Sequence, residues 1–524
     1  MGNPMISNPV LTGFNPDPSI VRVGEDYYIA TSTFEWYPGV QISHSKNLRD
    51  WKVVSRPLTR YSQLDLRGCP NSGGVWAPCL TFQDGVYYLI FTDVKYWAGD
   101  FKVTHNYLVT ATAIDGDWSD PIFLNSSGFD PTLFHDEDGR KWLLNVLWDH
   151  RPLHQSFAGI LLQEYDPSRK ALVGEVKNIF LGSSIGLVEG PHIYQRNGYY
   201  YLLTAEGGTF RTHAATVARA KHIAGPYELM PDNPLLSSAK NPELKLQSGG
   251  HGCFVENSDG SWLFAHLCRR PLKGGRSILG RETAIQNIEW INDWPRLKSG
   301  NTTPQEAFDS PFVESEISET ASVTDNFEST GISLDWQAPR IPITQFTSLT
   351  EKPGYLRIYG REAIVSMFEQ SLVARRQKAF HIAASTCLQY QPENIQQMAG
   401  LVAFYNTHAF YYLYVTYAEH SKKCLGIMRC EKGVLSYLIE KEYPLDDWDN
   451  IYLKLEIEFD RIRFFYSENG QEWFVVGSEY DASILSDEHA LPCGFTGNFV
   501  GMACQDISGI QLPADFEWFK YEEL

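Results

Sequence analysis

Short apolar strands separated by polar, glycine-containing turns recur along the first 300 residues of the chain. Three of them follow an acidic residue close to a proline, in the stretches Asn15-Pro16-Asp17-Pro18-Ser19-Ile20, Phe129-Asp130-Pro131-Thr132-Leu133 and Val188-Glu189-Gly190-Pro191-His192-Ile193. Each stretch leads through an apolar run and a polar turn into an aromatic strand, such as Tyr27-Tyr28-Ile29. The pattern predicts a repeated unit of strand, turn and strand.

The same unit occurs twice more without the carboxylate, at Trp76-Ala77-Pro78-Cys79-Leu80 and at His251-Gly252-Cys253-Phe254-Val255. Five copies at a period of roughly 60 residues indicate a repeat architecture. In a β-propeller, repeated small sheets surround an axis, and the innermost strand of each sheet faces a central channel. The sequence therefore predicts a five-bladed β-propeller. Its axial pocket is expected to be surrounded by Asp17, Ala77, Asp130, Glu189 and His251.

The second half of the chain lacks this acidic repeat but retains strand patterning. Residues 301–322 are acidic and rich in Ser and Thr, which is typical of a linker. Later segments alternate like strands, for example Phe410-Tyr411-Tyr412-Leu413-Tyr414-Val415. A β-sandwich over residues 323–524 fits this pattern best. Because long helical periodicity is absent, we expect an all-β protein with the propeller at residues 1–300.

Composition narrows the choice of partner and compartment. The net charge is −19 and clusters of Lys and Arg are absent, which argues against nucleic acid or an anionic membrane as partner. Aromatic residues make up 14% of the chain, and they suit both strands and sugar-binding surfaces. The segment Met1–Ser7 lacks a signal-peptide pattern, and no apolar run is long enough for a bilayer. We therefore expect a soluble cytoplasmic protein.

The three carboxylates suit the hydrolysis of an acetal between sugars. That reaction needs a proton for the leaving oxygen, and either a base that activates water or a carboxylate that attacks carbon. A third carboxylate raises the pKa of its neighbour and so keeps the acid protonated. A single Asp or Glu beside a strand commonly caps a turn. Three buried carboxylates in otherwise apolar strands are costly, however, and this cost favours a catalytic role.

Specific motifs resemble those of family 43 glycoside hydrolases of the β-xylosidase type. They are Gly13-Phe14-Asn15-Pro16-Asp17-Pro18-Ser19, Ser32-Thr33-Phe34-Glu35-Trp36-Tyr37-Pro38-Gly39-Val40, Val75-Trp76-Ala77-Pro78, Leu147-Trp148-Asp149-His150-Arg151, Glu189-Gly190-Pro191-His192, Ala205-Glu206-Gly207-Gly208-Thr209 and Leu279-Gly280-Arg281-Glu282-Thr283. In the second half, Gly494-Phe495-Thr496-Gly497-Asn498-Phe499-Val500-Gly501 resembles a loop of the family's sandwich domain. The resemblance therefore covers nearly the whole chain.

The resemblance implies an exo-acting, inverting enzyme that releases xylose from the non-reducing end of β-1,4-xylo-oligosaccharides. Asp17 would be the general base that activates water, and Glu189 the general acid. Asp130 would tune the pKa of the acid and orient it. Arg281 would contact the substrate, since a guanidinium donates paired hydrogen bonds to hydroxyls and carboxylates; its alternative is an ordinary ion pair.

The resemblance also implies which residues form the wall of the pocket. Phe34 and Trp76 would line the substrate, although most aromatic residues of β proteins belong to the core. Thr209 would form a polar wall. Phe499 would be the aromatic residue that the sandwich loop inserts into the pocket, with Phe495 close enough to be that residue instead.

His251 has two readings within the resemblance. It binds substrate, or it holds a calcium ion in the propeller channel through water. The spacing of carboxylates does not indicate a calcium site, so we expect that no cofactor is required. A homo-oligomer is expected by resemblance alone.

Two alternatives differ in substrate or in class. Related propellers act on arabinans or, with retention, on fructans, and many β-xylosidases of this type also release α-L-arabinofuranose. Carboxylates about 5–5.5 Å apart imply retention, whereas about 6.5–9.5 Å leaves room for water and implies inversion. The other alternative is a catalytically silent sugar-binding propeller, since fold alone does not establish chemistry.

Overall fold

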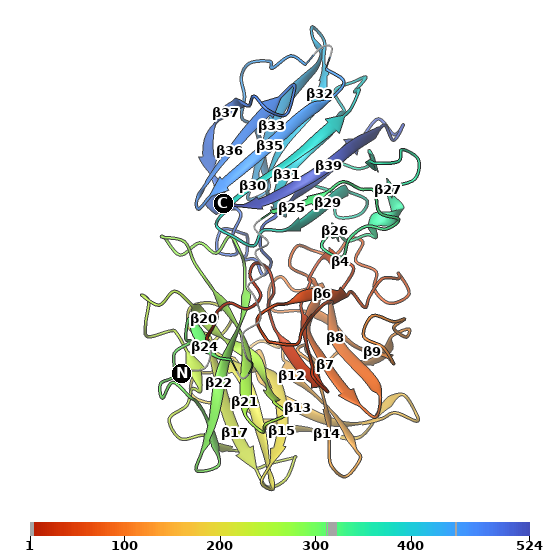
Figure 1. Ribbon diagram of the computed structural model, residues 1–524. Coiled ribbons are helices and arrows are strands. Elements are labelled where there is room, and N and C mark those ends of the chain that lie inside the picture. Colours follow the sequence, from red (N-terminus) through yellow and green to blue (C-terminus); the bar gives the residue numbers. More distant parts are fainter. Residues whose placement is uncertain (1–4, 311, 313–321, 446–447) are drawn as a thin grey trace.

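The computed structural model describes residues 5–310, 312, 322–445 and 448–524, which form two stacked all-β units (Figure 1). Among these residues the only helices are two short 3-10 turns, Ile343–Gln345 and Ala482–Ile484. Nothing helical in this part of the chain is long and apolar enough to cross a membrane. The predicted all-β class is confirmed. The predicted domain boundaries stay a prediction.

Within the described residues, the first unit consists mainly of five antiparallel sheets, each begun by one copy of the sequence repeat. The sheets are β2 (Ser19–Val23), β3 (Asp26–Thr31), β5 (Gln41–Ser45) and β6 (Lys52–Ser55); β7 (Gly74–Gln83), β8 (Val86–Tyr96), β9 (Val103–Ala111) and β10 (Ile122–Asn125); β11 (Thr132–His135), β12 (Lys141–Trp148), β13 (Phe157–Asp166) and β14 (Ala171–Phe180); β15 (Glu189–Arg196), β16 (Tyr199–Glu206), β17 (Ala214–Ala220), β18 (Glu228–Leu229) and β19 (Leu236–Ser237); and β20 (Gln247–Glu256), β21 (Trp262–Arg269), β22 (Glu282–Ile291) and β23 (Trp294–Leu297). Buried apolar side chains of their strands form a core between adjacent sheets.

The first strands of these sheets form a closed cycle of contacts. β2 contacts β7, β7 contacts β11, β11 contacts β15, β15 contacts β20, and β20 returns to β2. Such a cycle around an axis is the arrangement of a propeller. The segments that carry Asp17, Asp130 and Glu189 are thereby brought to one axis, as the repeat predicts.

The second unit packs two sheets face to face. One contains β25 (Ser322–Asp325), β27 (Thr347–Ser348), β28 (Leu356–Tyr359), β30 (His381–Gln389), β35 (Ile451–Glu458), β36 (Arg461–Ser467), β37 (Phe474–Asp481) and β39 (Pro513–Glu523). The other contains β29 (Ser371–Arg376), β31 (Gln397–Asn406), β32 (Ala409–Ala418), β33 (Lys422–Glu431), β34 (Val434–Tyr437) and β38 (Phe499–Asp506). The apolar faces of both sheets meet in one large core, which confirms the predicted sandwich.

The two units share backbone pairing and core. β4 (Trp36–Tyr37) of the propeller pairs with β26 (Ala338–Pro339) of the second unit. The ring of Phe499 stacks on Trp36 at a centroid distance of 3.5 Å. This junction fixes the sandwich over the mouth of the propeller.

The predicted linker, residues 301–322, lies partly outside the described residues, which omit 311 and 313–321. The described part contains β24 (Ala307–Asp309), which pairs with β1 (Met5–Ser7) beside the propeller. The segment following β23 therefore belongs to the first unit at least as far as Asp309.

Candidate active site

Backbone strain marks the positions where the repeat reaches the axis. Asp17, Ala77 and Asp130 each precede a proline and have φ angles of +54°, +35° and +54°. Positive φ at a residue other than glycine costs about 1–3 kcal/mol and is concentrated at functional sites. In the fourth copy Gly190 takes this position with φ +56°, so Glu189 lies one residue earlier than the two aspartates. The three carboxylates therefore do not occupy the same position of the repeat, because Glu189 lies one residue before the position that Asp17 and Asp130 occupy.

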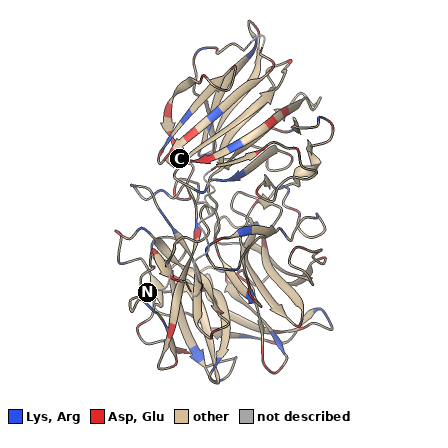
Figure 2. Cartoon of the chain, in the orientation of Figure 1, with Lys and Arg blue, Asp and Glu red and all other residues tan. Residues whose placement is uncertain are grey.

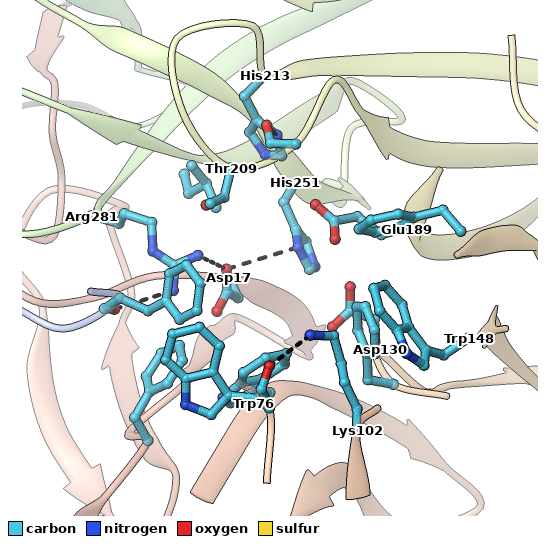
Figure 3. Close-up of a pocket in the computed structure, with 17 residues that line it drawn as sticks. Asp17, Trp76, Lys102, Asp130, Trp148, Glu189, Thr209, His213, His251 and Arg281 are labelled. Atoms are coloured by element: carbon cyan, nitrogen blue, oxygen red, sulfur yellow. Dashed lines mark hydrogen bonds and ion pairs between the residues drawn. The ribbon is translucent and has the colours of Figure 1, made fainter. Parts of the chain in front are cut away.

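One pocket of about 240 Å³ unites most of the predicted residues (Figure 3). Of the ten predicted site residues, eight line it: Asp17, Phe34, Trp76, Asp130, Glu189, Thr209, His251 and Arg281. Ala77 and Phe499 are buried elsewhere. The axial convergence inferred from the repeat thus holds for the carboxylates and for His251.

Asp17 is held by cationic and neutral donors. Arg281 Nη1 lies 2.8 Å from Oδ1, and the Ser32 hydroxyl donates to Oδ2 at 2.7 Å. His251 Nδ1 lies 3.8 Å from Oδ1. Burial raises the pKa of Asp17, but Arg281, His251 and the Ser32 hydrogen bond together outweigh it, so the pKa lies below the ordinary value of 3.8. Asp17 is therefore an ionised carboxylate at neutral pH.

Ala77 acts on Asp17 through its backbone rather than as part of the pocket wall. Its N–H donates to Ser32 Oγ at 2.8 Å, and the same hydroxyl donates to Asp17. The predicted position of Ala77 around the axial pocket is corrected by this geometry, because Ala77 is buried and does not line the pocket. The repeat correctly locates Ala77 near the axis, but the relay through Ser32 needs the fold.

Asp130 and Glu189 form the opposite side of the site. Burial raises the pKa of Glu189, and the charge of Asp17 raises it further. Burial also raises the pKa of Asp130, with contributions from Glu189 and Asp17. The N–H of Gly190 donates to Asp130 Oδ2 at 3.1 Å, which ties Asp130 to the backbone beside Glu189. This pair retains a proton at pH values at which Asp17 is ionised.

Lys102 is a charged pocket residue that the sequence reasoning missed. Its ammonium donates to the carbonyl of Trp97 at 2.9 Å and lies 4.3 Å from the Trp148 ring centroid. Burial lowers the pKa of Lys102, and the positive charge of Lys102 in turn lowers that of Glu189. Lys102 lies outside the repeat motifs, and nothing in its sequence surroundings distinguishes it from a surface lysine.

The aromatic residue supplied by the sandwich is Phe495, not Phe499. Phe495 lines the pocket and lies 5.7 Å from Trp76 between ring centroids. Its carbonyl accepts a hydrogen bond from Arg281 Nη2 at 3.2 Å. Phe499 is fully buried because it begins β38 and stacks on Trp36. The sequence does not decide which of the two phenylalanines enters the pocket. The position at which β38 begins decides it, because Phe499 lies in the strand and Phe495 lies before it.

Three buried polar atoms at the pocket have no hydrogen-bond partner among the described residues. They are Thr209 Oγ1, His213 Nε2 and Arg281 Nε. Leaving such groups unpaired is costly, so their presence in a pocket wall indicates a polar ligand. Together with the aromatic walls, they suit a ring that carries hydroxyl groups.

The donors around His251 do not form a direct metal site. Asp17 is already bound to Arg281, and burial lowers the pKa of His251. Among the described residues, no group of three or more His, Cys, Asp and Glu side chains is placed to hold a metal ion. A directly coordinated ion does not fit, whereas calcium held through water stays a prediction.

Family models match both units of the chain. Residues 6–295 match glycosyl hydrolases family 43. The chain belongs to glycosyl hydrolases family 43. Residues 324–522 match the β-xylosidase C-terminal concanavalin A-like domain. The resemblance found in the sequence motifs is thereby confirmed.

Full-length relatives of this family 43 enzyme agree in length and fold. A β-xylosidase of Bacillus subtilis (strain 168) is 48% identical over 99% of each chain. Xylosidase/arabinosidase 43B of Humicola insolens is 49% identical over 99% of this chain and 98% of its own. The crystal structure of a xylan β-1,4-xylosidase from Bacillus halodurans C-125 superimposes with a TM-score of 0.97, at 52% identity over 99% of this chain and 100% of its own.

Several pocket residues of the family 43 enzyme escaped the sequence reasoning. They are Trp97, Lys102, Phe129, Trp148, Phe157, Gly208, His213 and Leu267. Phe129 occupies the same position in its repeat as Trp76 and Glu189, one residue before the strained position, so the register could have identified it. Trp148 and Gly208 lie within the quoted motifs, but nothing in those motifs distinguishes a lining residue from a core residue.

Proposed function

We propose that the chain is an exo-acting, inverting β-xylosidase. The observation that carries this proposal is the contrast within one pocket between ionised Asp17 and the proton-retaining pair of Asp130 and Glu189. Carboxyl groups whose pKa values are pushed apart are suited to act as base and acid. A module that only binds sugar has no need for that difference.

In the proposed reaction, Glu189 gives its proton to the glycosidic oxygen as the bond from that oxygen to the anomeric carbon breaks. Asp17 takes a proton from water, whose oxygen forms the new bond to the anomeric carbon from the opposite face. Asp130 binds the N–H of Gly190 and thereby holds Glu189 in place. Arg281 keeps Asp17 ionised before the water proton arrives.

The small pocket supports exo action. Its volume of about 240 Å³ lies below the roughly 300–1,000 Å³ of sites for drug-sized ligands. Phe495 and Trp97, whose ring centroids are 5.1 Å apart, both line it. One terminal sugar residue fits such a space, and the rest of the chain extends outward.

We propose β-1,4-xylo-oligosaccharides as substrates, with release of α-L-arabinofuranose as a side activity. The names of the relatives from Bacillus subtilis, Humicola insolens and Bacillus halodurans support these substrate classes. Arabinosides are the second candidate substrate, favoured by the printed name of the Humicola relative.

Proton NMR of xylobiose hydrolysis tests the proposal. We expect α-xylose as the first product, because inversion of a β-linkage gives the α-anomer. First release of β-xylose contradicts inversion and indicates a covalent intermediate. Cleavage of arabinosides without cleavage of xylobiose contradicts the proposed substrate. The control variant is Asp138→Asn, because Asp138 lies at an exposed blade turn.

We further propose a homo-oligomer that works in the cytoplasm on short imported oligosaccharides. Light scattering after size exclusion checks the first point, and a monomer at micromolar concentration contradicts it. Cell fractionation checks the second, and activity in the medium contradicts it.

A further inference from the structure

A second cavity, of about 750 Å³, lies between the propeller and the sandwich and shares no lining residue with the catalytic pocket. Lys52 and Arg56 reach it from the propeller, and Arg375, Arg376 and Lys378 reach it from the sandwich. Figure 2 shows this arrangement as blue segments on β6 and β29, at the boundary of the two units. Cationic side chains of both units therefore line this cavity.

The charge of the cavity wall is unbalanced within the described residues. Three carboxylates line the cavity: Asp50, Asp335 and Glu523. Asp50 already has a partner, as does the neighbouring lining residue Arg49. Asp335 is 40% exposed, and its oxygen lies 3.7 Å from Arg375 Nη2, so this ion pair is long and solvated. The five cations named above outnumber the two remaining carboxylates.

Arg56 is buried and incompletely bonded. Only 5% of its surface is exposed. Its Nε donates to the carbonyl of Leu334 at 2.9 Å, and its Nη2 donates to Gln41 Oε1 at 2.8 Å. Its Nη1 has no acceptor among the described residues. A charged donor at the cavity wall is thus left unpaired.

Arg376 repeats this situation from the sandwich side. It is 4% exposed, its Nη1 donates to Asn15 Oδ1 at 2.7 Å, and its Nη2 has no described acceptor. Arg375 is 5% exposed, and its Nε also lacks one. Three buried guanidinium groups on one cavity therefore each retain an unused donor.

Such an arrangement favours the entry of a further negative charge. Burial lowers the pKa of Arg56 to about 9. Burial also lowers the pKa of Arg376, and the proximity of Arg56 lowers it further. Buried charged donors without acceptors are costly, and a bound anion that accepts hydrogen bonds from them offsets that cost.

We propose that this interdomain cavity binds a small dianionic oxyanion, the phosphate group of inorganic phosphate or of a phosphorylated small molecule. Guanidinium groups present N–H donors in a planar fork that matches phosphate oxygens. The cavity volume leaves room for a small organic group beside the phosphate. No catalytic residue takes part in the binding.

Isothermal titration calorimetry of the full-length enzyme with inorganic phosphate, and separately with glucose 6-phosphate, tests the site at constant ionic strength in sodium chloride. We expect saturable binding of at least one of the two. Tighter binding of glucose 6-phosphate identifies a phosphorylated small molecule as the ligand, and equal or tighter binding of phosphate identifies the free anion. Saturating xylose leaves the affinity unchanged, because the two cavities are separate.

Arg56→Gln weakens the binding by about tenfold or more, the loss expected for one charge-assisted hydrogen bond. The control variant Arg140→Gln alters an exposed arginine paired with Asp138 and leaves binding unchanged. The melting temperature gives a second readout, since phosphate raises it for the wild type more than for Arg56→Gln.

If Arg56→Gln does not fold, Lys52→Gln provides the same comparison, because Lys52 is exposed at the start of β6 and can be changed without disturbing the core. We expect it to weaken binding by a few fold. Absence of saturable binding by either phosphate compound, or equal affinity in the wild type and the tested variants, overturns the proposal.

Discussion

Arg281 Nη1 lies 2.8 Å from Asp17 Oδ1, although the two residues are 264 positions apart in the chain. This ion pair joins the segment before β2, in the first sheet, to the residue before β22, in the last sheet, and so it spans the seam of the propeller. The other terminal nitrogen of Arg281 donates to the Phe495 carbonyl of the sandwich. One side chain thus connects the proposed base, the propeller seam and the second unit.

Replacing Arg281 by Met removes the nearest positive charge from Asp17. We expect the acidic limb of the kcat/KM profile to move to higher pH, because the pKa of Asp17 rises while activity requires its ionised form. At the optimum, kcat/KM falls on the order of a hundredfold. The pH profile of xylobiose hydrolysis measures both effects, and an unchanged acidic limb contradicts the role given to Arg281.

Asp17→Asn and Glu189→Gln each lower kcat by roughly 10²–10⁴-fold, the range for loss of a general base or acid. Glu189→Gln is less harmful with 4-nitrophenyl xyloside, since that leaving group needs little protonation. Asp138→Asn, at an exposed turn, keeps wild-type activity. Steady-state kinetics with xylobiose and with 4-nitrophenyl xyloside tests these two roles. If Glu189→Gln lowers kcat equally on both substrates, Glu189 is not the general acid.

We expect Lys102→Met to move the basic limb of the pH–activity profile to higher pH. The ammonium of Lys102 lowers the pKa of Glu189, so its removal allows the acid to keep its proton to higher pH. Activity requires the protonated form of Glu189, so activity persists to higher pH. A downward shift, or an unchanged limb, shows that Lys102 does not act on the acid.

Phe495→Ala and Phe499→Ala separate a pocket wall from a core residue. Phe495→Ala raises KM severalfold while the melting temperature changes little, because its ring lines the pocket. Phe499→Ala lowers the free energy of unfolding by about 3–5 kcal/mol, the usual cost of deleting a buried aromatic ring. Chemical denaturation combined with kinetics distinguishes them, and the reverse assignment of effects refutes the placement.

We expect removal of divalent metal by a chelator to leave kcat within about twofold, since Arg281 already compensates the charge of Asp17. Dialysis against EDTA followed by activity measurement, with re-addition of calcium as the control, checks this. Loss of activity that calcium restores contradicts it and supports the water-mediated site beside His251.

The repeat in the sequence was sufficient to predict the propeller and the meeting of Asp17, Asp130 and Glu189, whereas strand patterning in the second half predicted the sandwich and the all-β class. Strand periodicity and prolines are local signals, and symmetry about an axis turns equivalent positions of a repeat into neighbours in space. The family resemblance added Phe34, Trp76, Thr209 and Arg281.

Only the tertiary structure decided which side chains complete the site. Lys102 and His213 come from loops outside the repeat register. Phe495 rather than Phe499 enters the pocket because β38 begins at Phe499 and buries it against Trp36. The pKa difference between Asp17 and Glu189 likewise depends on burial and on Arg281, which the chain brings in from a distant sheet. Local sequence specifies strands and turns, whereas long-range packing sets charge, burial and the final contacts of each side chain.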